Sequence, residues 1–561
     1  MTETAEPGTV THLLRARAHE APDAPGIFCA DGAGGWIEWS WSEYWEHARQ
    51  AGAGLRASGI GRGDHVVMLV AEIDLAVKLL FGAWSIGAVP ILVGVPYRLT
   101  DLAGFAAELG RTAQRLDART LVVSEALAAA TAEAQPAGAA LRVLGAGSVL
   151  AAADDGGALE PADAGATAFI QLTSGSTGHP RGAVISHAAL VSHLTAISTA
   201  LPLAGPAARC VTWLPLHHDM GLVGGLLYPL FNAFPVNVMS PLAFRGDPFG
   251  WLQTLSDVRA TCTPGPPSAY AIAARLAPRA VEAGLDLRAL ACAMIGAEPI
   301  APALLRSFAE AFAPCGFRPE AWFPVYGLAE ATVAVTFPRL LGATHFDRVD
   351  RARLEREGRA VPCEGGPAAI EFVGVGRPLP GTQLRIVRDG VPGGEREVGE
   401  IEVRAPSLMD GYYGEPEATA EVMRDGWLHT GDLGYETGGS LFVTGRSKDV
   451  IIKGGHNLLP AAIEEIAGGV DGIRAGCVAA VGVASQQRAT ELVYVVCETK
   501  ITADDERAQL SRAVRAALRL HGIAVDRVLL VEPGTIPRTT SGKIRRREVA
   551  RTLAGSPGRA G

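Results

Sequence analysis

Short apolar runs alternate with segments of helical periodicity along the first part of the chain. Residues 44–57 carry one apolar helical face, which consists of Tyr44, Ala48, Ala51 and Leu55. Residues 66–70 (VVMLV) then predict a buried strand, and residues 75–84 predict the next helix. Strands that alternate with helices in this way form mostly parallel sheets with both faces covered. The pattern therefore predicts an α/β fold.

Two uncharged stretches, residues 79–97 and 220–244, are long enough to suggest membrane spans. Glycines interrupt both stretches, and so do the prolines at positions 90, 96, 229, 235 and 241. A buried helix followed by a buried strand explains each stretch better than a bilayer crossing does. We therefore expect no membrane span.

Three later segments are less regular. Residues 126–165 are rich in alanine and glycine and weakly patterned, so they predict helices with loose connections. Residues 400–403 (EIEV) alternate as a half-exposed strand does, and residues 426–445 carry turn signals.

A new pattern of strands and helices begins after Arg446, with apolar strands expected at residues 478–483 and 492–497. At 561 residues the chain is also too long for a single core. We therefore predict a large N-terminal domain, residues 1–446, with parallel sheets flanked by helices. Residues 447–561 should form a small α+β domain.

Composition excludes several function classes. Hydrophobic residues make up 48% and charged residues 19%, which is typical of a folded chain. The net charge of −9 argues against broad binding of nucleic acid or anionic membrane. The 8 cysteines are scattered without a CxxC pair, so they fit neither a zinc site nor a disulfide framework. The first six residues lack an apolar signal core, and we expect a cytoplasmic protein.

The most informative local pattern is the loop at residues 172–182 (LTSGSTGHPRG), which apolar runs flank on both sides. Its glycines let backbone N–H groups approach phosphates closely, and its hydroxyls add neutral donors. Arg181 adds a positive charge that can fork onto phosphate oxygens. No Gly-Lys-Ser/Thr closes the loop, so it is not a Walker A loop. A polyphosphate site and a solvated turn are both compatible with the loop alone.

Six further clusters of chemically capable residues follow. Taken singly, each is also compatible with a core histidine, a turn, a capping acid or a basic tail. The clusters are WLPLHHDMG (213–221), MIGAEP (294–299), YGLAEAT (326–332), LHTGDLG (428–434), GRSKD (445–449) and IPRTTSGK (536–543).

Together and in this order, the loop and the clusters resemble those of the acyl-adenylate-forming superfamily. This superfamily includes acyl-CoA synthetases, adenylation domains of nonribosomal peptide synthetases and beetle luciferases. The resemblance covers nearly the whole chain. The histidine and glutamate clusters are most similar to those of fatty acyl-AMP ligases. So is the long stretch between Glu330 and Gly376, which contains VDRARLE (349–355) and resembles an insertion that marks those ligases.

The resemblance implies that a carboxylate attacks the α-phosphorus of ATP, which gives acyl-AMP and pyrophosphate, and that a thiol then displaces AMP. Such chemistry depends mainly on positioning and charge neutralisation. The residues implied to hold the phosphates are Thr173, Ser174, Gly175, Ser176, Thr177, Gly178 and Arg181. The nucleotide site would also include Gly296, Ala297, Glu298, Tyr326 and Gly327, with the first four at the adenine.

The resemblance also assigns catalytic roles. Glu330 would reach Mg²⁺, a hard cation that prefers oxygen ligands. Asp432 would accept hydrogen bonds from the ribose hydroxyls, with Arg446 in support. His218 would stand beside the carboxylate being activated, and Lys543 would stabilise charge in the adenylation transition state.

Lys448 occupies the position implied to be the hinge. A rotation of the C-terminal domain about it would withdraw Lys543 and open a route for the thiol. Three departures from the usual pattern matter. Arg181 stands where lysine is commoner, and residues 455–460 (GHNLLP) lack the usual flanking polar residues. Residues 266–270 (PPSAY) lack the bulkier Asn-Phe pair that usually precedes Ala-Tyr in fatty acyl-AMP ligases. The acid could therefore be long, medium, branched or aromatic.

The interpretation with most support is an acyl-AMP ligase that uses ATP and Mg²⁺ and delivers its acyl group to an acyl carrier protein. An acyl-CoA ligase differs only in using CoA as the acceptor. A non-catalytic acyl or nucleotide sensor is the third alternative. It is disfavoured because a binding module need not retain Lys543.

Overall fold

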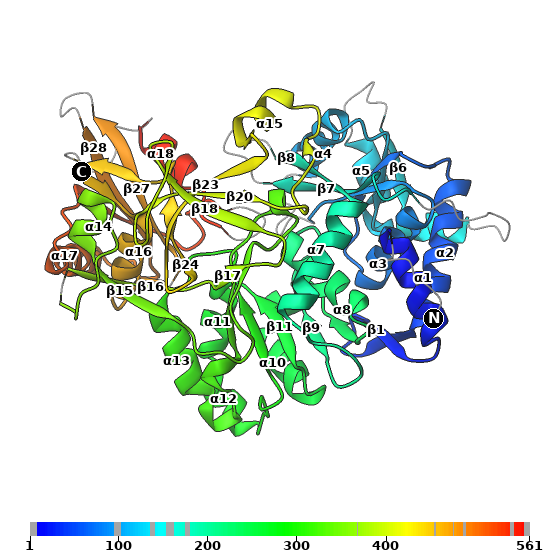
Figure 1. Cartoon of the computed structure of the whole chain (residues 1–561), viewed down its shortest axis with the longest axis horizontal. Helices are drawn as coiled ribbons and strands as arrows, with labels where there is room; N and C mark the ends of the chain where they lie inside the picture. Colours follow the sequence, from blue (N-terminus) through cyan, green and yellow to red (C-terminus); the bar gives the residue numbers. More distant parts are fainter. Residues whose placement is uncertain are drawn as a thin grey trace.

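The computed structural model describes residues 8–94, 102–134, 141–152, 162–173, 180–366, 368–453, 456–474, 476–485, 490–538 and 543–554. Figure 1 shows the beginning of the chain at one end of the molecule and the C-terminal elements at the other end. The middle of the chain lies between them.

A seven-stranded sheet forms the centre of the N-terminal part. Its order is β13-β12-β11-β9-β10-β1-β2, and every neighbouring pair is parallel except β1 with β2. The strands are β1 (Pro25–Ala30), β2 (Trp36–Ser40), β9 (Cys210–Thr212), β10 (Val236–Val238), β11 (Cys262–Gly265), β12 (Cys292–Ile295) and β13 (Trp322–Pro324).

Two smaller sheets also belong to the N-terminal part. The first is fully parallel, with the order β4-β3-β5-β6. Its strands are β3 (His65–Leu69), β4 (Val89–Leu92), β5 (Thr120–Val123) and β6 (Arg142–Gly145). The second is antiparallel, in the order β21-β8-β7, and consists of β7 (Thr167–Thr173), β8 (Arg181–Ser186) and β21 (Gly411–Tyr412).

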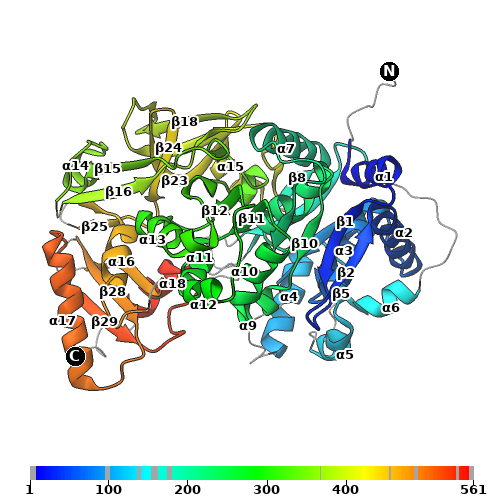
Figure 2. The same cartoon turned by 90° about the horizontal axis from the view of Figure 1, so that it is seen from below.

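Helices surround these sheets, as Figure 2 shows from below. Helix α2 illustrates why they form: Ser40 and Glu43 make a capping box at its start, and the predicted apolar face is buried. Its Gly52 faces Gly82 of α3 so closely that a Cβ on Gly82 would lie 2.8 Å from the Gly52 nitrogen. The helices are α1 (Val10–Glu20), α2 (Trp41–Ala57), α3 (Ile73–Ser85), α4 (Leu102–Arg115), α5 (Glu125–Glu133), α6 (Ala146–Ala151), α7 (His187–Ala200), α8 (Tyr228–Phe231), α9 (Pro241–Gly246), α10 (Pro248–Asp257), α11 (Pro267–Ala274), α12 (Ala277–Glu282) and α13 (Pro302–Phe312), with short 3₁₀ turns η2 (Ala313–Cys315) and η3 (Pro319–Ala321).

An antiparallel sheet follows in the order β19-β18-β20-β23-β22, and β24 pairs with β23. Its elements are β18 (Gln383–Arg388), β19 (Val391–Pro392), β20 (Gly399–Arg404), α15 (Pro416–Val422), β22 (Met423–Arg424), β23 (Trp427–Thr437) and β24 (Ser440–Arg446). The turn signals read at residues 426–445 were therefore wrong for most of this range. The pairing of β23 with β24 shifts register at Gly434, where a Cβ would lie 2.7 Å from the Phe442 carbonyl oxygen. Gly431 and Gly434 therefore mark an irregular strand, whereas Gly426, Gly438 and Gly439 lie in turns, as the signals predicted.

The long stretch between Glu330 and Gly376, called the insertion segment below, folds as a small unit. It contains β14 (Thr336–Phe337), β15 (Phe346–Asp350), α14 (Arg351–Glu357) and β16 (Ala369–Val373). Strands β15 and β16 pair in antiparallel fashion, and β14 pairs with β17 (Arg377–Pro378). Asp350 caps α14 by accepting from the Arg353 N–H.

The C-terminal part has its own sheet, β27-β28-β29, and its own cores. Its elements are β25 (Ile451–Lys453), β26 (His456–Leu458), α16 (Pro460–Gly468), β27 (Val478–Ser485), β28 (Thr490–Glu498), α17 (Asp504–Leu520), β29 (Arg527–Val531) and α18 (Arg546–Ala554). The strands expected at 478–483 and 492–497 are confirmed. The division at residues 446 and 447 stays a prediction.

The predicted α/β class, with a large N-terminal part and a smaller α+β part, is confirmed. The weakly patterned residues 126–165 contain a strand, β6, which the sequence did not predict. Residues 400–403 form a strand as expected, but Glu402 is only 2% exposed, because Arg385 on the neighbouring strand pairs with it. Within the described ranges, none of the helices combines the length and the apolar sequence that a bilayer crossing requires.

Candidate active site

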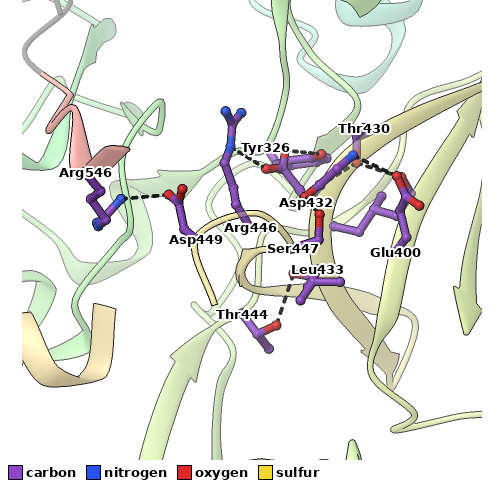
Figure 3. A network of polar contacts seen from close by, with 12 residues as sticks. Tyr326, Glu400, Thr430, Asp432, Leu433, Thr444, Arg446, Ser447, Asp449 and Arg546 are labelled. Carbon is purple, nitrogen blue, oxygen red and sulfur yellow. Dashed lines mark hydrogen bonds and ion pairs between the residues drawn. The ribbon is translucent and has the colours of Figure 1, made fainter. Parts of the chain in front are cut away.

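Asp432 on β23 is buried and is the centre of a polar network that reaches the surface at Arg446 (Figure 3). One oxygen accepts from the Tyr326 hydroxyl at 2.8 Å, and the other accepts from Nε of Arg446 at 2.8 Å. Arg446 reaches Asp432 because the two residues are paired across β23 and β24. Burial raises the pKa of the Tyr326 phenol well above its usual range, so the hydroxyl keeps its proton and donates. The structure thus brings three of the expected nucleotide residues together.

The backbone before Asp432 is held by neighbouring polar groups. The Gly431 N–H donates to Glu400 at 2.9 Å, and the Gly431 carbonyl accepts from the Ser447 N–H at 2.9 Å. Gly431 has a φ of 71°, which glycine adopts without strain. Asp432 therefore lies within an irregular strand and not at its end.

Glu330 lies on the short 3₁₀ turn η4 (Ala329–Ala331). Its approach to the site depends on Gly327, where a Cβ would lie 1.8 Å from the Val333 carbonyl oxygen. One Glu330 oxygen, Oε1, accepts a hydrogen bond from the Tyr412 hydroxyl at 2.7 Å. Because a carboxylate has two oxygens, the second can serve as a ligand for a hard cation.

The predicted strand, loop and strand around residues 172–182 is confirmed at both ends by β7 and β8. Thr173 ends β7, and its hydroxyl lies 3.4 Å from the Arg181 carbonyl oxygen. The guanidinium of Arg181 lies over the Tyr412 ring at 5.3 Å and beside Glu415, with Nε 3.2 Å from a carboxylate oxygen. Ser174, Gly175, Ser176, Thr177 and Gly178 lie outside the described residues.

Gly296, Ala297 and Glu298, which the resemblance assigns to the adenine, follow the carboxyl end of β12. Gly296 packs against Val325, the residue after β13, since a Cβ there would lie 2.9 Å from the Val325 carbonyl oxygen. Ala297 is exposed with a φ of 68°, which is uncommon for a residue with a side chain. Glu298 accepts hydrogen bonds from the N–H and the hydroxyl of Ser268 at the start of α11, at 3.0 and 3.2 Å. These contacts fix the turn in place.

The histidine cluster precedes η1 (Met220–Leu227), which is a π-helix. The sequence predicted a buried helix here but not this rare form, which often occurs at functional sites. The rings of His217 and His218 lie 4.5 Å apart, and burial holds the pKa of His217 well below its usual range. Asp219 caps the helix by accepting from the Met220 N–H at 2.7 Å.

The pKa of Asp219, in the histidine cluster, responds to the charges of two other predicted site residues, Glu330 and Lys543. Burial and the charge of Glu330 raise the pKa of the Asp219 carboxyl to about 6, and the charge of Lys543 opposes this rise. The ammonium group of Lys543 therefore lies within electrostatic reach of Asp219. The role of Lys543 as the catalytic lysine stays a prediction, and the charge effect on Asp219 is compatible with it.

The expected hinge residue, Lys448, is exposed and lies between two anchored neighbours. Before it, Arg446 is bound to Asp432. After it, Asp449 pairs with Arg546 of α18 at 3.2 Å, as Figure 3 shows. Arg546 also forks onto Glu464 of α16.

One His/Glu group in the described part of the chain has ligand atoms within 4.8 Å of one another, and it consists of Glu400, Glu402 and His429. Arg385 binds Glu402 at 2.6 Å from one side, and His429 lies 3.1 Å from it on the other. Arg385, Glu402 and His429 lie opposite one another on β18, β20 and β23, so they form a row of polar cross-strand pairs.

Comparison with known proteins agrees with this geometry. The sequence profile of the AMP-binding enzyme family matches residues 14–413. The chain belongs to this family. It is an adenylate-forming ligase, and a solved fatty acyl-adenylate ligase, described from E. coli and L. pneumophila, superposes with a TM-score of 0.91 at 31% identity, covering 98% of both chains.

Curated relatives of this ligase differ in their named acceptors. A putative acyl-CoA synthetase of Caulobacter vibrioides is 33% identical over 90% of this chain and 88% of its own. A medium-chain-fatty-acid–[acyl-carrier-protein] ligase of Moorena producens, JamA, is 35% identical over 68% of this chain and 66% of its own.

Sequence reasoning about the ligase missed two side chains that contact expected site residues, Tyr412 and Glu415, and a third, Asp219, whose pKa responds to the charges of Glu330 and Lys543. Asp219 was within a recognised cluster but had no assigned role, and Tyr412 and Glu415 were outside all clusters. The signal available for the last two was a glycine-flanked aromatic pair followed by an acid and a proline, residues 411–416 (GYYGEP). Such a pattern predicts a turn but does not reveal that the turn reaches Glu330 and Arg181.

Proposed function

We propose that the protein activates a fatty or other apolar carboxylic acid as acyl-AMP and transfers the acyl group to the phosphopantetheine thiol of an acyl carrier protein. The observation that carries the first half is the Asp432 carboxylate, which is 5% exposed and is held by the Tyr326 hydroxyl and by Nε of Arg446 at 2.8 Å each. We assign this carboxylate to the ribose, and we assign Lys543, whose charge opposes the rise that burial causes in the pKa of the Asp219 carboxyl, to stabilise the negative charge that develops during adenylation. The support for an apolar acid is the π-helix after His218, which consists of apolar residues and glycines (MGLVGGLL).

In the proposed reaction, an oxygen of the substrate carboxylate attacks the α-phosphorus of ATP. The bond from the α-phosphorus to the bridging oxygen breaks, and pyrophosphate leaves. Asp432 accepts from the ribose hydroxyls while Tyr326 and Arg446 hold it in place, and Arg181 lies at the end of the loop proposed to hold the phosphates. Lys543 neutralises charge between the acyl carboxylate and the α-phosphate.

The donors around Glu330 fit a magnesium ion. Glu330 presents one oxygen that Tyr412 does not bind, and Mg²⁺ is commonly held by one or two carboxylates together with substrate phosphates. When bound, Mg²⁺ would neutralise charge on the phosphates. We assign Glu330 as its protein ligand.

For the second half, we propose that the C-terminal domain, residues 447–561, rotates about Lys448. A thiol then attacks the acyl carbon, its proton is lost to solvent, and AMP leaves. Lys543 would be withdrawn in this step. The alternative acceptor is CoA, which would make the protein an acyl-CoA ligase.

The insertion segment supports the carrier protein as the acceptor, because it is in contact with the C-terminal part. Arg351 of α14 donates to the backbone carbonyl of His521 at the end of α17. Leu354 is 6% exposed and shares one apolar cluster with Leu459 and Ala462 of the C-terminal part. Figure 1 shows α14 next to these elements.

These contacts must break or rearrange for the C-terminal part to rotate. A docked carrier protein can offset that cost with interface contacts, whereas free CoA brings no comparable interface. We therefore expect acyl-AMP to accumulate with CoA alone and to be consumed when the holo-carrier protein is present.

The test begins with pyrophosphate exchange over a panel of carboxylic acids of different length and branching. Acid-dependent exchange is the expected result, and its absence for the whole panel despite ATP binding would favour a non-catalytic homologue. The best acid is then offered with CoA or with a cognate holo-carrier protein, and the apo-carrier protein is the control. A comparable kcat/KM for CoA and for the carrier protein would favour the acyl-CoA ligase.

A further inference from the structure

The turn at residues 409–415 lies between two charged residues of the proposed ATP site, Glu330 and Arg181. On one side, the Met409 N–H donates to the Glu330 carbonyl oxygen at 2.8 Å. On the other side, β21 pairs with β8, the strand that begins at Arg181. The turn is therefore attached both to the proposed metal ligand and to the exit of the proposed phosphate loop.

Tyr412 is the residue of this turn whose side chain contacts both ends. Its hydroxyl donates to Oε1 of Glu330 at 2.7 Å, and its ring lies below the guanidinium of Arg181 at 5.3 Å. The residue is 8% exposed, so few other conformations are open to its ring. The Tyr412 N–H donates to the Thr419 hydroxyl at 2.8 Å, which ties the turn to α15.

The hydrogen bond has a directional consequence for Glu330. A carboxylate on a short 3₁₀ turn can rotate about its side-chain bonds and present either oxygen to the site. The hydroxyl of Tyr412 holds Oε1, so Oε2 is left to face a cation. Partners that orient a metal-binding carboxylate commonly change metal affinity by about 10- to 100-fold when they are removed.

We propose that Tyr412 is a positioning residue for the divalent cation, because its hydroxyl orients the Glu330 carboxylate before nucleotide binds. The proposal rests on the function proposed above, in which Glu330 is the cation's protein ligand. Tyr412 itself contacts neither the cation nor the reacting atoms. Its ring also packs against the guanidinium of Arg181, so Tyr412 fixes the distance between Arg181 and Glu330.

The neighbouring Tyr413 provides a matched control. Its ring meets His65 edge to face at 4.8 Å, and its N–H pairs with the Gly182 carbonyl oxygen at 2.8 Å. Substituting phenylalanine at either position removes a single hydroxyl and leaves the backbone pairing with β8 in place. The two variants therefore differ in whether the lost hydroxyl faces Glu330.

The test measures binding of Mn²⁺ to the full-length enzyme by electron paramagnetic resonance, in the presence of an ATP analogue with a methylene bridge between the α- and β-phosphorus. Tyr412→Phe should weaken Mn²⁺ binding about tenfold, and Tyr413→Phe should leave it unchanged. Metal-free AMP binding should be the same for both variants, which shows that the site is folded. In pyrophosphate exchange, Tyr412→Phe should raise the half-saturating Mg²⁺ concentration while the rate at saturating Mg²⁺ recovers.

Glu330→Gln separates failure of this inference from failure of the function on which it rests. If Glu330→Gln loses Mn²⁺ affinity and Tyr412→Phe keeps it within about twofold of the unaltered enzyme, the role of Tyr412 is overturned and the role of Glu330 stands. If Glu330→Gln also keeps its Mn²⁺ affinity, both assignments are overturned.

Discussion

The contact between α14 and the C-terminal part leads to a quantitative prediction about acceptor choice. Arg351 and Glu355 form a buried ion pair at 2.9 Å, with side chains 8% and 7% exposed. Arg351 also donates to the His521 carbonyl, so it links the insertion segment to the C-terminal part. A hydrogen bond from a charged donor contributes about 1.5–3 kcal/mol. Its loss should favour the rotated arrangement by roughly 10- to 150-fold.

Removing Arg351 alone would leave Glu355 buried without its partner, which typically costs about 3–5 kcal/mol of stability. The double variant Arg351→Met/Glu355→Leu avoids this, because apolar residues of similar size can replace a buried pair at little cost. We expect acyl-CoA formation with CoA as sole acceptor to rise at least about tenfold. Pyrophosphate exchange should change less than about twofold, because the adenylation residues are untouched.

The same helix provides the control. Arg353 and Glu357 form an exposed pair at 2.8 Å, with side chains 45% and 44% exposed. Arg353→Met/Glu357→Leu should leave acyl-CoA formation unchanged. The assay is chromatographic separation of acyl-AMP from acyl-CoA over time. If the buried-pair variant is folded and makes acyl-CoA no faster than the control, the insertion segment does not restrain rotation through Arg351.

Three further predictions concern the lysines and one buried histidine. Lys543→Ala should slow pyrophosphate exchange by ~10²-fold or more, the scale for losing one preorganised charged contact, while thioester formation from supplied acyl-AMP changes much less. Lys448→Pro fixes φ near −65° and should leave acyl-AMP formation intact but block thioester formation, so acyl-AMP accumulates; full turnover by this variant would remove Lys448 from the mechanism. Burial lowers the pKa of His193 from 6.5 to about 3, so the unfolded chain takes up a proton that the folded chain refuses, and stability should fall as the pH drops below about 6.5. His193→Gln, which can still accept from the Ala334 N–H, should flatten that fall in urea unfolding between pH 7 and pH 5.

The sequence predicted those parts of the fold whose signals are local. The helix at residues 44–57 has a capping box, an apolar face and a terminal glycine, and it forms almost as expected. β7 and β8 were predicted because apolar runs flank a glycine-rich loop. β23 and β24 were missed because Gly431 and Gly434 lie at irregular positions inside β23 while Gly438 and Gly439 form the turn between the strands, and the sequence does not distinguish the two uses.

The candidate site was likewise predicted only where its residues lie in recognisable local patterns. Asp432, Arg446 and Tyr326 were found because they lie in recognisable clusters, and the structure joins them. Tyr412 was not found, because it meets Glu330 across 82 positions of sequence through a turn without a distinctive pattern. The π-helix after Asp219 was not predicted, because its packing on a strand, such as Gly225 against Thr212 of β9, depends on tertiary structure. A single sequence therefore indicates the reactive residues more clearly than the residues that position them.

The ion pairs on either side of Lys448 explain how one hinge could serve both halves of the proposed reaction. Arg446 is bound to Asp432 in the N-terminal part, and Asp449 is bound to Arg546, three positions after Lys543. A rotation confined to Lys448 would therefore keep Asp432 and Arg446 together while Asp449, Arg546 and the Lys543 segment move as a unit. The ribose carboxylate would stay with its partner after the lysine has left. Acyl-AMP could then remain bound through its nucleotide until the thiol arrives, because the residues proposed to hold the adenylate and the lysine proposed to activate the acid lie on opposite sides of the proposed hinge.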